Sequence, residues 1–182
     1  MTRRFLLRST GLLLMLALLF TSDAYAQRDN SEPRASPNAA VSQTIGTTVI
    51  DMHFSRPGVK GRTIFGDLVP YGNVWRAGAN EPTTITFSDD VQVEGQMLEA
   101  GTYNLFIRPN ENGPWDVIFT TQVDWGTMYD QADPVLEVSA EPMDAPMQEW
   151  MTYRFEDVGD GSATLVMHWA ETGLPISIST TG

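Results

Sequence analysis

The sequence predicts an all-β protein: a single-domain antiparallel β-sandwich, jelly-roll-like or Ig-like, with one long ordered loop. Apolar and polar residues alternate in short runs from Val41 onward, and turn residues separate these runs. Eleven prolines, all of them after residue 26, leave little room for helices.

The predicted strands each carry their apolar residues on one face. In chain order, the alternating runs span residues 84–87, 91–93, 102–108, 115–119, 151–156, 165–169 and 176–179. Tyr103, Leu105 and Ile107, for example, alternate with polar residues. Successive side chains of a strand point to opposite faces, so this alternation indicates strands with one buried face.

Turn-forming residues fill the gaps between the runs. Gly95 and Gly101 mark two turns, and the stretch 110–114 (NENGP) marks a third. Gly159-Asp160-Gly161 predicts a hairpin that joins roughly residues 150–157 to residues 162–170.

The first 26 residues have the pattern of a secretory signal peptide. Three arginines precede an apolar run of ten residues at 11–20, and Ala24-Tyr25-Ala26 supplies the small residues of a cleavage site before Gln27. The run is shorter than the about 20 residues of a membrane-spanning helix. We therefore expect export to the periplasm or the extracellular space, with no membrane span after cleavage. Residues 2–8 (TRRFLLR) also fit a twin-arginine signal, so both export routes stay open.

The rest of the chain divides into a spacer and one domain. Residues 27–40 are polar, contain two prolines and lack apolar periodicity, which predicts a disordered linker. Residues 41–182 are then expected to form the β-sandwich domain. The chain has no cysteine, so it forms no disulfide and offers no thiolate for catalysis.

The charge of the chain is strongly acidic. The full sequence has a formal net charge of −12, and removal of the signal would leave 8 basic against 22 acidic residues, a net of −14. Nucleic acids and anionic lipid surfaces are bound through lysine and arginine, so this composition argues against both as partners.

The block at 55–82 departs from simple strand patterning. Loops of this length in a compact domain are uncommon and are usually functional or disordered. Its apolar residues, among them Ile64, Phe65, Val74 and Trp75, favour an ordered loop that buries them.

Three segments carry a resemblance to a known family. They are SRPGVKGRTIFGDLVPYGNVWRAGANEPTTITF at 55–87, VQVEGQMLEAGTYNLFIRP at 91–109 and WDVIF at 115–119. With these segments the chain resembles the bacterial domain of unknown function 2911 family, from roughly Val41 to the C-terminus. The resemblance implies an exported, all-β protein. It implies no reaction and no catalytic residues.

A candidate ligand site follows from the residue types in this block. Aromatic faces stack on apolar patches of a ligand, while arginine, amide and carboxylate groups orient its polar groups. The candidate binding residues are Arg62, Asp67, Tyr71, Trp75, Arg76, Asn80 and Glu81. The competing interpretation is structural: Arg62 and Arg76 pair with Asp67 and Glu81 to hold the loop, and the aromatic residues cap the core.

Other chemistries find little support. His53 and His168 lie 115 positions apart on separate predicted strands, so no metal site is predicted. His53 and Ser55 would share a strand face, but no acid completes a catalytic triad. No glycine-rich phosphate or dinucleotide motif occurs, so no cofactor is predicted.

Three functions remain open. The first is a non-catalytic binding or interaction module of the cell envelope, whose partner would be a sugar, a peptide, another small polar ligand or an envelope protein. The second is a small hydrolase that uses Glu81 or Asp67 as acid or base with His53 nearby. The third is a purely structural domain, and no catalytic residue is assigned.

Overall fold

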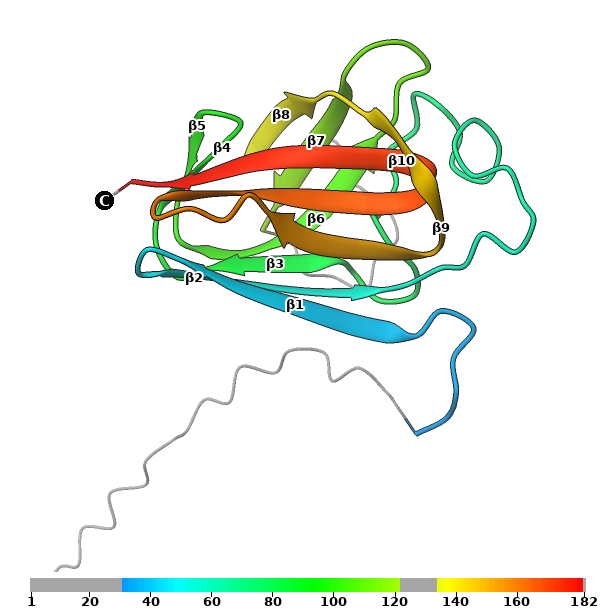
Figure 1. The fold of residues 1–182 in the computed structure, drawn as a ribbon, viewed down its shortest axis with the longest axis horizontal. Helices are drawn as coiled ribbons and strands as arrows, with labels where there is room; N and C mark the ends of the chain where they lie inside the picture. The colour runs from blue at the N-terminus through cyan, green and yellow to red at the C-terminus, as the bar shows by residue number, and fades with distance from the viewer. Residues whose placement is uncertain (1–30, 122–133, 182) are drawn as a thin grey trace, which may run out of the picture.

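The protein is an antiparallel β-sandwich, seen in a computed structural model that describes residues 31–121 and 134–181. Figure 1 shows the two sheets packed face to face. The strands are β1 (Asn38–Ile45), β2 (Thr48–Ser55), β3 (Thr84–Phe87), β4 (Val91–Val93), β5 (Gln96–Leu98), β6 (Gly101–Arg108), β7 (Trp115–Thr120), β8 (Leu136–Ala140), β9 (Met143–Glu156) and β10 (Ser162–Thr180). The described residues contain no helix, which confirms the predicted fold class.

The larger sheet has six strands in the order β1-β2-β3-β6-β7-β8. Its first two strands form a hairpin in which Asn38 lies opposite Ser55. Gly46 turns this hairpin with a φ of 58°, a left-handed conformation that glycine adopts without steric cost. β1 thus begins at Asn38, within the segment that the sequence analysis assigns to the linker.

The smaller sheet has four strands in the order β5-β4-β10-β9. The predicted hairpin is confirmed, because Leu165 of β10 lies opposite Phe155 of β9. Both strands extend beyond it: β10 bends near Ala170, where the register with β9 shifts, and continues to pair with β4 at 178–180. Figure 1 shows the two arms of β10 running side by side. The two predicted runs at 165–169 and 176–179 are therefore parts of one strand.

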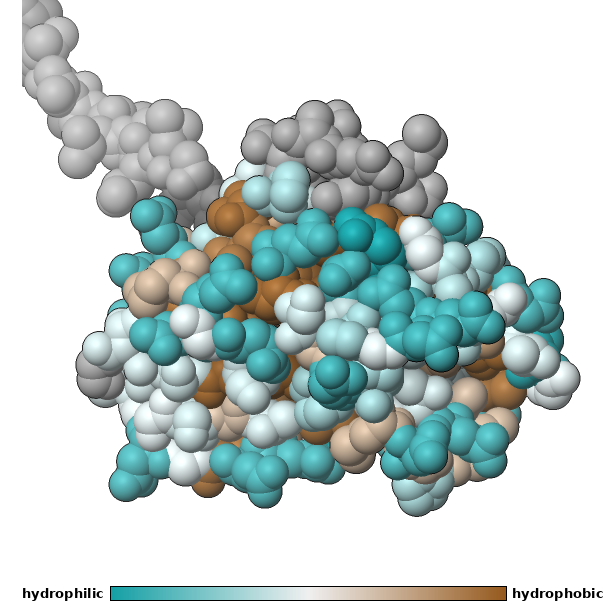
Figure 2. All heavy atoms as spheres, turned by 90° about the horizontal axis from the view of Figure 1, so that it is seen from above, coloured by the Kyte–Doolittle hydropathy of each residue, from teal (hydrophilic) through white to brown (hydrophobic). Residues whose placement is uncertain are grey.

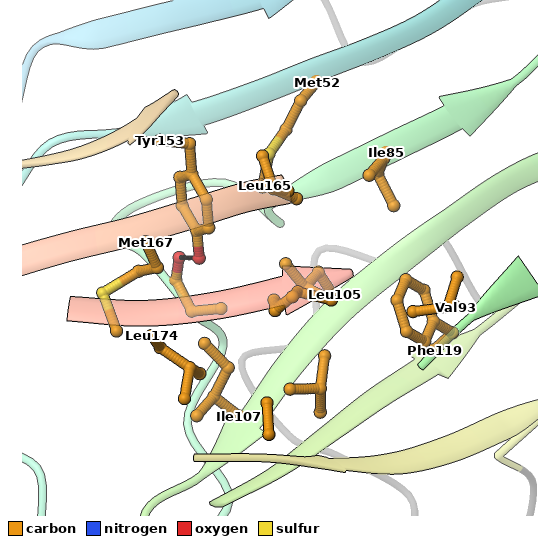
Figure 3. Close-up of a cluster of buried hydrophobic side chains, with 14 of the residues drawn as sticks. Met52, Ile85, Val93, Leu105, Ile107, Phe119, Tyr153, Leu165, Met167 and Leu174 are labelled. Atoms are coloured by element: carbon orange, nitrogen blue, oxygen red, sulfur yellow. Dashed lines mark hydrogen bonds between the residues drawn. The ribbon is translucent and has the colours of Figure 1, made fainter. Parts of the chain in front are cut away.

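One continuous core fills the space between the sheets. Strand alternation supplies it: Met52 of β2, Ile85 of β3 and Leu105 of β6 face Leu165 and Met167 of β10. Figure 3 shows these side chains converging from both sheets, with the buried Tyr153 among them. Burial of apolar area at roughly 25 cal/mol per Å² makes this cluster the main source of stability in a protein without disulfides.

Outward-facing positions are mostly polar. Figure 2 shows one face of the molecule, on which hydrophilic residues cover most of the surface and hydrophobic residues show between them. Within the described ranges, no helix has the length and apolar character needed to span a membrane.

Candidate functional site

The long loop between β2 and β3 is anchored along its whole length. Near its middle, the amide of Gly66 donates to the carbonyl of Val69. Further on, Trp75 and Ile107 form an antiparallel bridge, with N–H···O distances of 2.8 and 2.9 Å. Residues around Trp75 therefore run beside β6 past the end of β3, and the prediction of an ordered loop is confirmed.

Trp75 faces the interior. Its ring stacks on Trp169 of β10, with centroids 5.6 Å apart and an interplanar angle of 23°, and it meets the edge of Phe65 at 6.2 Å. The indole N–H donates to the carbonyl of Gly78 at 3.1 Å. Trp75 thus closes one end of the core, which is the arrangement that the structural interpretation expected for this residue.

Arg76 faces the opposite side of the sheet. Because Trp75 and Ile107 both point inward, alternation places Arg76 on the outer face of the six-stranded sheet, beside Phe106. Its side chain is half-buried, and its buried Nε has no hydrogen-bond acceptor. In residues 31–121 and 134–181, no carboxylate or carbonyl group pairs with this guanidinium.

The turn that follows Arg76 is held from several directions. The carbonyl of Ala77 accepts hydrogen bonds from the hydroxyls of Tyr153, at 2.8 Å, and Thr83, at 3.1 Å. Gly78 packs so closely that a β-carbon there would lie 2.4 Å from Thr83 Oγ1. Asn80 is exposed, and its side-chain amide donates to the carbonyl of Ser36. The turn at 77–80 is therefore fixed in position.

Glu81 ends the turn in a buried polar network. It is only 3% exposed, and Oε1 accepts a hydrogen bond from Arg34 at 2.5 Å. Its Oε2 lies 3.3 Å from the hydroxyl of Ser55, which also donates to Asn38 Oδ1 at 2.8 Å. Arg34 contacts Asn38 as well, at 3.2 Å. The network satisfies a carboxylate that would otherwise be costly to bury.

The remaining predicted residues lie elsewhere on the loop. Arg62 donates to the carbonyls of Gly58 and Val59, at 2.6 and 3.1 Å, and so fastens the first part of the loop through backbone groups rather than through Asp67. Asp67 is exposed on the turn between Phe65 and Val69. Tyr71 is exposed, and a β-carbon on Gly66 would meet its ring. Arg76, Asn80 and Glu81 therefore lie on one turn, while Arg62, Asp67 and Tyr71 lie elsewhere on the loop and Trp75 packs against the core.

The two histidines belong to different sheets. His53 is exposed on the outer face of β2, opposite Thr84 of β3. His168 of β10 is buried: Nδ1 lies 3.0 Å from Arg154 Nη1, and Nε2 lies 2.8 Å from the carbonyl oxygen of Pro146. Arginine only donates, so Nδ1 must accept and the proton resides on Nε2. His168 thus serves as a structural link in the smaller sheet.

Three residues of the site were not among those predicted from the sequence. Arg34 and Asn38 come from the segment assigned to the linker, and Ser55 was considered only as a nucleophile beside His53. Arg34 and Glu81 are separated by 47 positions, and Arg34 lies outside the segments that carry the family resemblance. Their pairing depends on the β1–β2 hairpin, which places Asn38 beside Ser55.

The fold and this polar turn define a β-sandwich protein with an ordered loop, whose turn at 76–81 is the candidate site. The chain matches the family model described as "Protein of unknown function (DUF2911)" over residues 36–178, and it belongs to that family. This confirms the resemblance seen in the sequence. No curated protein and no solved structure matches the chain.

Proposed function

We propose that the protein is a non-catalytic binding module of the cell envelope that takes a small polar ligand at the turn of residues 76–81. The observation that carries the proposal is how this turn is held: Tyr153 fixes it from the smaller sheet, and the network of Arg34, Ser55 and Glu81 fixes it from the larger one. Groups held rigidly before a ligand arrives lose little entropy on binding, which favours recognition.

The same network argues against a hydrolase that uses Glu81 or Ser55. Ser55 has no exposed surface, and Glu81 is committed to Arg34. A nucleophile or general base must reach the reacting atom of its substrate. As placed, neither side chain is open to one, whereas Arg76 is half-buried and Asn80 exposed on the same turn. Arg76 is therefore available for binding, and Asn80 lies exposed on the same turn with its side-chain amide hydrogen-bonded to Ser36.

The envelope location rests on the N-terminal segment. Its positive start, apolar run and small residues before Gln27 are typical of an exported protein. Fractionation of the bacterium, with the mass of the processed chain measured, tests this part of the proposal. Recovery of the uncleaved chain from the cytoplasm would contradict it.

The binding part is tested by NMR titration. We expect a neutral disaccharide, short peptides or small organic acids to give saturable shifts of the amide resonances of 76–81. A double variant, Arg76→Gln with Asn80→Gly, should lose this binding; glycine suits position 80 because Asn80 has a φ of 59°. Arg62→Gln is the matched control, since Arg62 lies on another part of the loop. Equal affinities in all three proteins would place the site elsewhere.

A further inference from the structure

We infer that Arg76 is the subsite for a carboxylate group of the ligand, an inference that rests on the proposed function. Each of the other arginines in the described part of the chain has a carboxylate or a backbone carbonyl as acceptor: Arg34, Arg56, Arg62, Arg108 and Arg154. Arg76 has none, although its Nε is buried.

A partly buried guanidinium without an acceptor is costly. Removing a charged donor from water without a compensating hydrogen bond carries a penalty, and buried polar atoms without a partner are rare in folded proteins. An anion that binds Arg76 would remove this penalty. An anion therefore stabilises the guanidinium of Arg76 more than it would stabilise an arginine that is already solvated by water.

The charges on the turn favour a ligand group with a single negative charge. Arg34 and Glu81 form an ion pair, so the one positive charge on the turn without a counter-charge is that of Arg76. A single planar guanidinium matches one carboxylate, which it can bind through two parallel hydrogen bonds. A doubly charged phosphate would have only one unpaired guanidinium to hold it on a strongly acidic protein.

The residues near Arg76 suit a ligand that is polar beyond its carboxylate group. By strand register, Arg76 lies beside the buried Phe106, and the next row of the outer face carries His53, Thr84 and the buried Asn104. Thr84 is half-buried and His53 exposed. A ligand anchored by its carboxylate at Arg76 can extend over this polar row. Both a free organic acid and the C-terminus of a peptide fit this description.

The test follows the backbone amide resonances of 76–81 by NMR at constant ionic strength in every protein, together with the side-chain Nε–H resonance of Arg76 in the proteins that keep this arginine. The probes are acetate, N-acetyl-alanyl-alanine, the C-terminal amide of the same peptide, and inorganic phosphate. We expect both carboxylates to give saturable shifts and the amide to give none. Affinity should fall about tenfold or more in Arg76→Gln, less in Arg76→Lys, and not at all in Arg62→Gln. Tighter binding of the peptide acid than of acetate would identify a peptide C-terminus as the ligand.

Several results would overturn the inference. The amide could bind as tightly as the acid, phosphate could bind as tightly as the carboxylates, or Arg76→Gln, with an otherwise unchanged spectrum, could bind as well as wild type. If neutral ligands bind the turn independently of Arg76, the inference fails while the binding module stands. If no probe of any class binds the turn, both fail.

Discussion

The hydroxyl of Tyr153 in β9 donates a hydrogen bond of 2.8 Å to the carbonyl oxygen of Ala77, and this bond ties the turn of the candidate site to the opposite sheet. Tyr153 is buried in the core, as Figure 3 shows. Ala77 is buried too, and its carbonyl also accepts from Thr83. The position of the site thus depends on packing between the two sheets as well as on its own loop.

Burial of Tyr153 makes stability sensitive to high pH. Desolvation raises the pKa of its hydroxyl above the ordinary value near 10. The unfolded chain then releases this proton at a lower pH than the folded protein does. The stabilising contribution is fully present below about pH 10 and falls as the pH rises further, by up to about 1.4 kcal/mol per pH unit.

Tyr153→Phe should remove this dependence. At pH 7 we expect the free energy of unfolding to fall by about 1 kcal/mol, because one hydrogen bond is lost while Ala77 keeps its bond from Thr83. Above pH 10 the decline should be shallower than in wild type. Urea unfolding between pH 7 and 11 measures both. Tyr103, whose pKa is raised by burial and by Glu99 and Asp90, adds its own slope in both proteins, so the difference isolates Tyr153. Parallel declines would contradict the prediction.

The ion pair of Arg34 with Glu81 should matter more than a surface pair. Arg34→Ala leaves a carboxylate that is 4% exposed without its guanidinium, and we expect a loss of about 2–3 kcal/mol in unfolding free energy. Arg108→Ala is the matched control, because its partners Asp116 and Glu137 stay solvated; about 0.5–1 kcal/mol is expected there.

A second variant separates charge from packing at this network. Adding Glu81→Gln to Arg34→Ala removes the unpaired buried charge, so the double variant should be more stable than Arg34→Ala alone. Equal losses of unfolding free energy in Arg34→Ala and Arg108→Ala would show that burial of Glu81 does not raise the cost of removing its partner.

The strands could be predicted from the sequence because their signal is local. Alternation within a few residues marks β3, β6 and β7, and the glycine turn marks the β9–β10 hairpin. β5 was not predicted, because it directly follows the predicted turn at Gly95 and a run of three residues is too short to show a period. The length of β9 was also missed, because its first half is largely exposed on both faces.

The site could be predicted only in part, because its contacts are not local. Residue types alone singled out Arg76, Asn80 and Glu81, but also four residues that the fold directs elsewhere. Trp75 and Arg76 are neighbours in sequence, yet the bridge to Ile107 sends one inward and the other outward. No spacing in the sequence reveals that bridge, nor the pairing of Glu81 with a residue 47 positions earlier.

Trp75 should contribute to stability rather than to binding. Trp75→Ala removes the stack on Trp169, the contact with Phe65 and the bond to Gly78, and we expect a loss of about 3 kcal/mol in unfolding free energy. Trp150→Ala is the control: this ring is exposed and mainly packs against Gly58 and Lys60, so about 1 kcal/mol is expected. Urea unfolding compares the two. A Trp75 variant as stable as the Trp150 variant would contradict the role of Trp75 as a core residue.

Gly78 should be required for space rather than for backbone conformation. Its φ lies outside the left-handed region, but a β-carbon would lie 2.4 Å from Thr83 Oγ1 and 3.4 Å from the carbonyl oxygen of Ser55. We expect Gly78→Ala to lower the unfolding free energy by about 1–3 kcal/mol through overpacking. Gly159→Ala should change it by less than about 0.5 kcal/mol, because the nearest atom there is 3.8 Å away.

The side chain of Thr83, which would clash with a β-carbon at position 78, can also be removed. Thr83→Ala alone costs about 1 kcal/mol, the value of its hydrogen bond to Ala77. Combined with Gly78→Ala it makes room for the new methyl group, so the loss in the double variant should be smaller than the sum of the two single losses. Urea unfolding of the four proteins measures this coupling. If the losses in unfolding free energy were strictly additive, the new methyl group would be accommodated without moving Thr83. The contact between Gly78 and Thr83 would then not determine the shape of the turn.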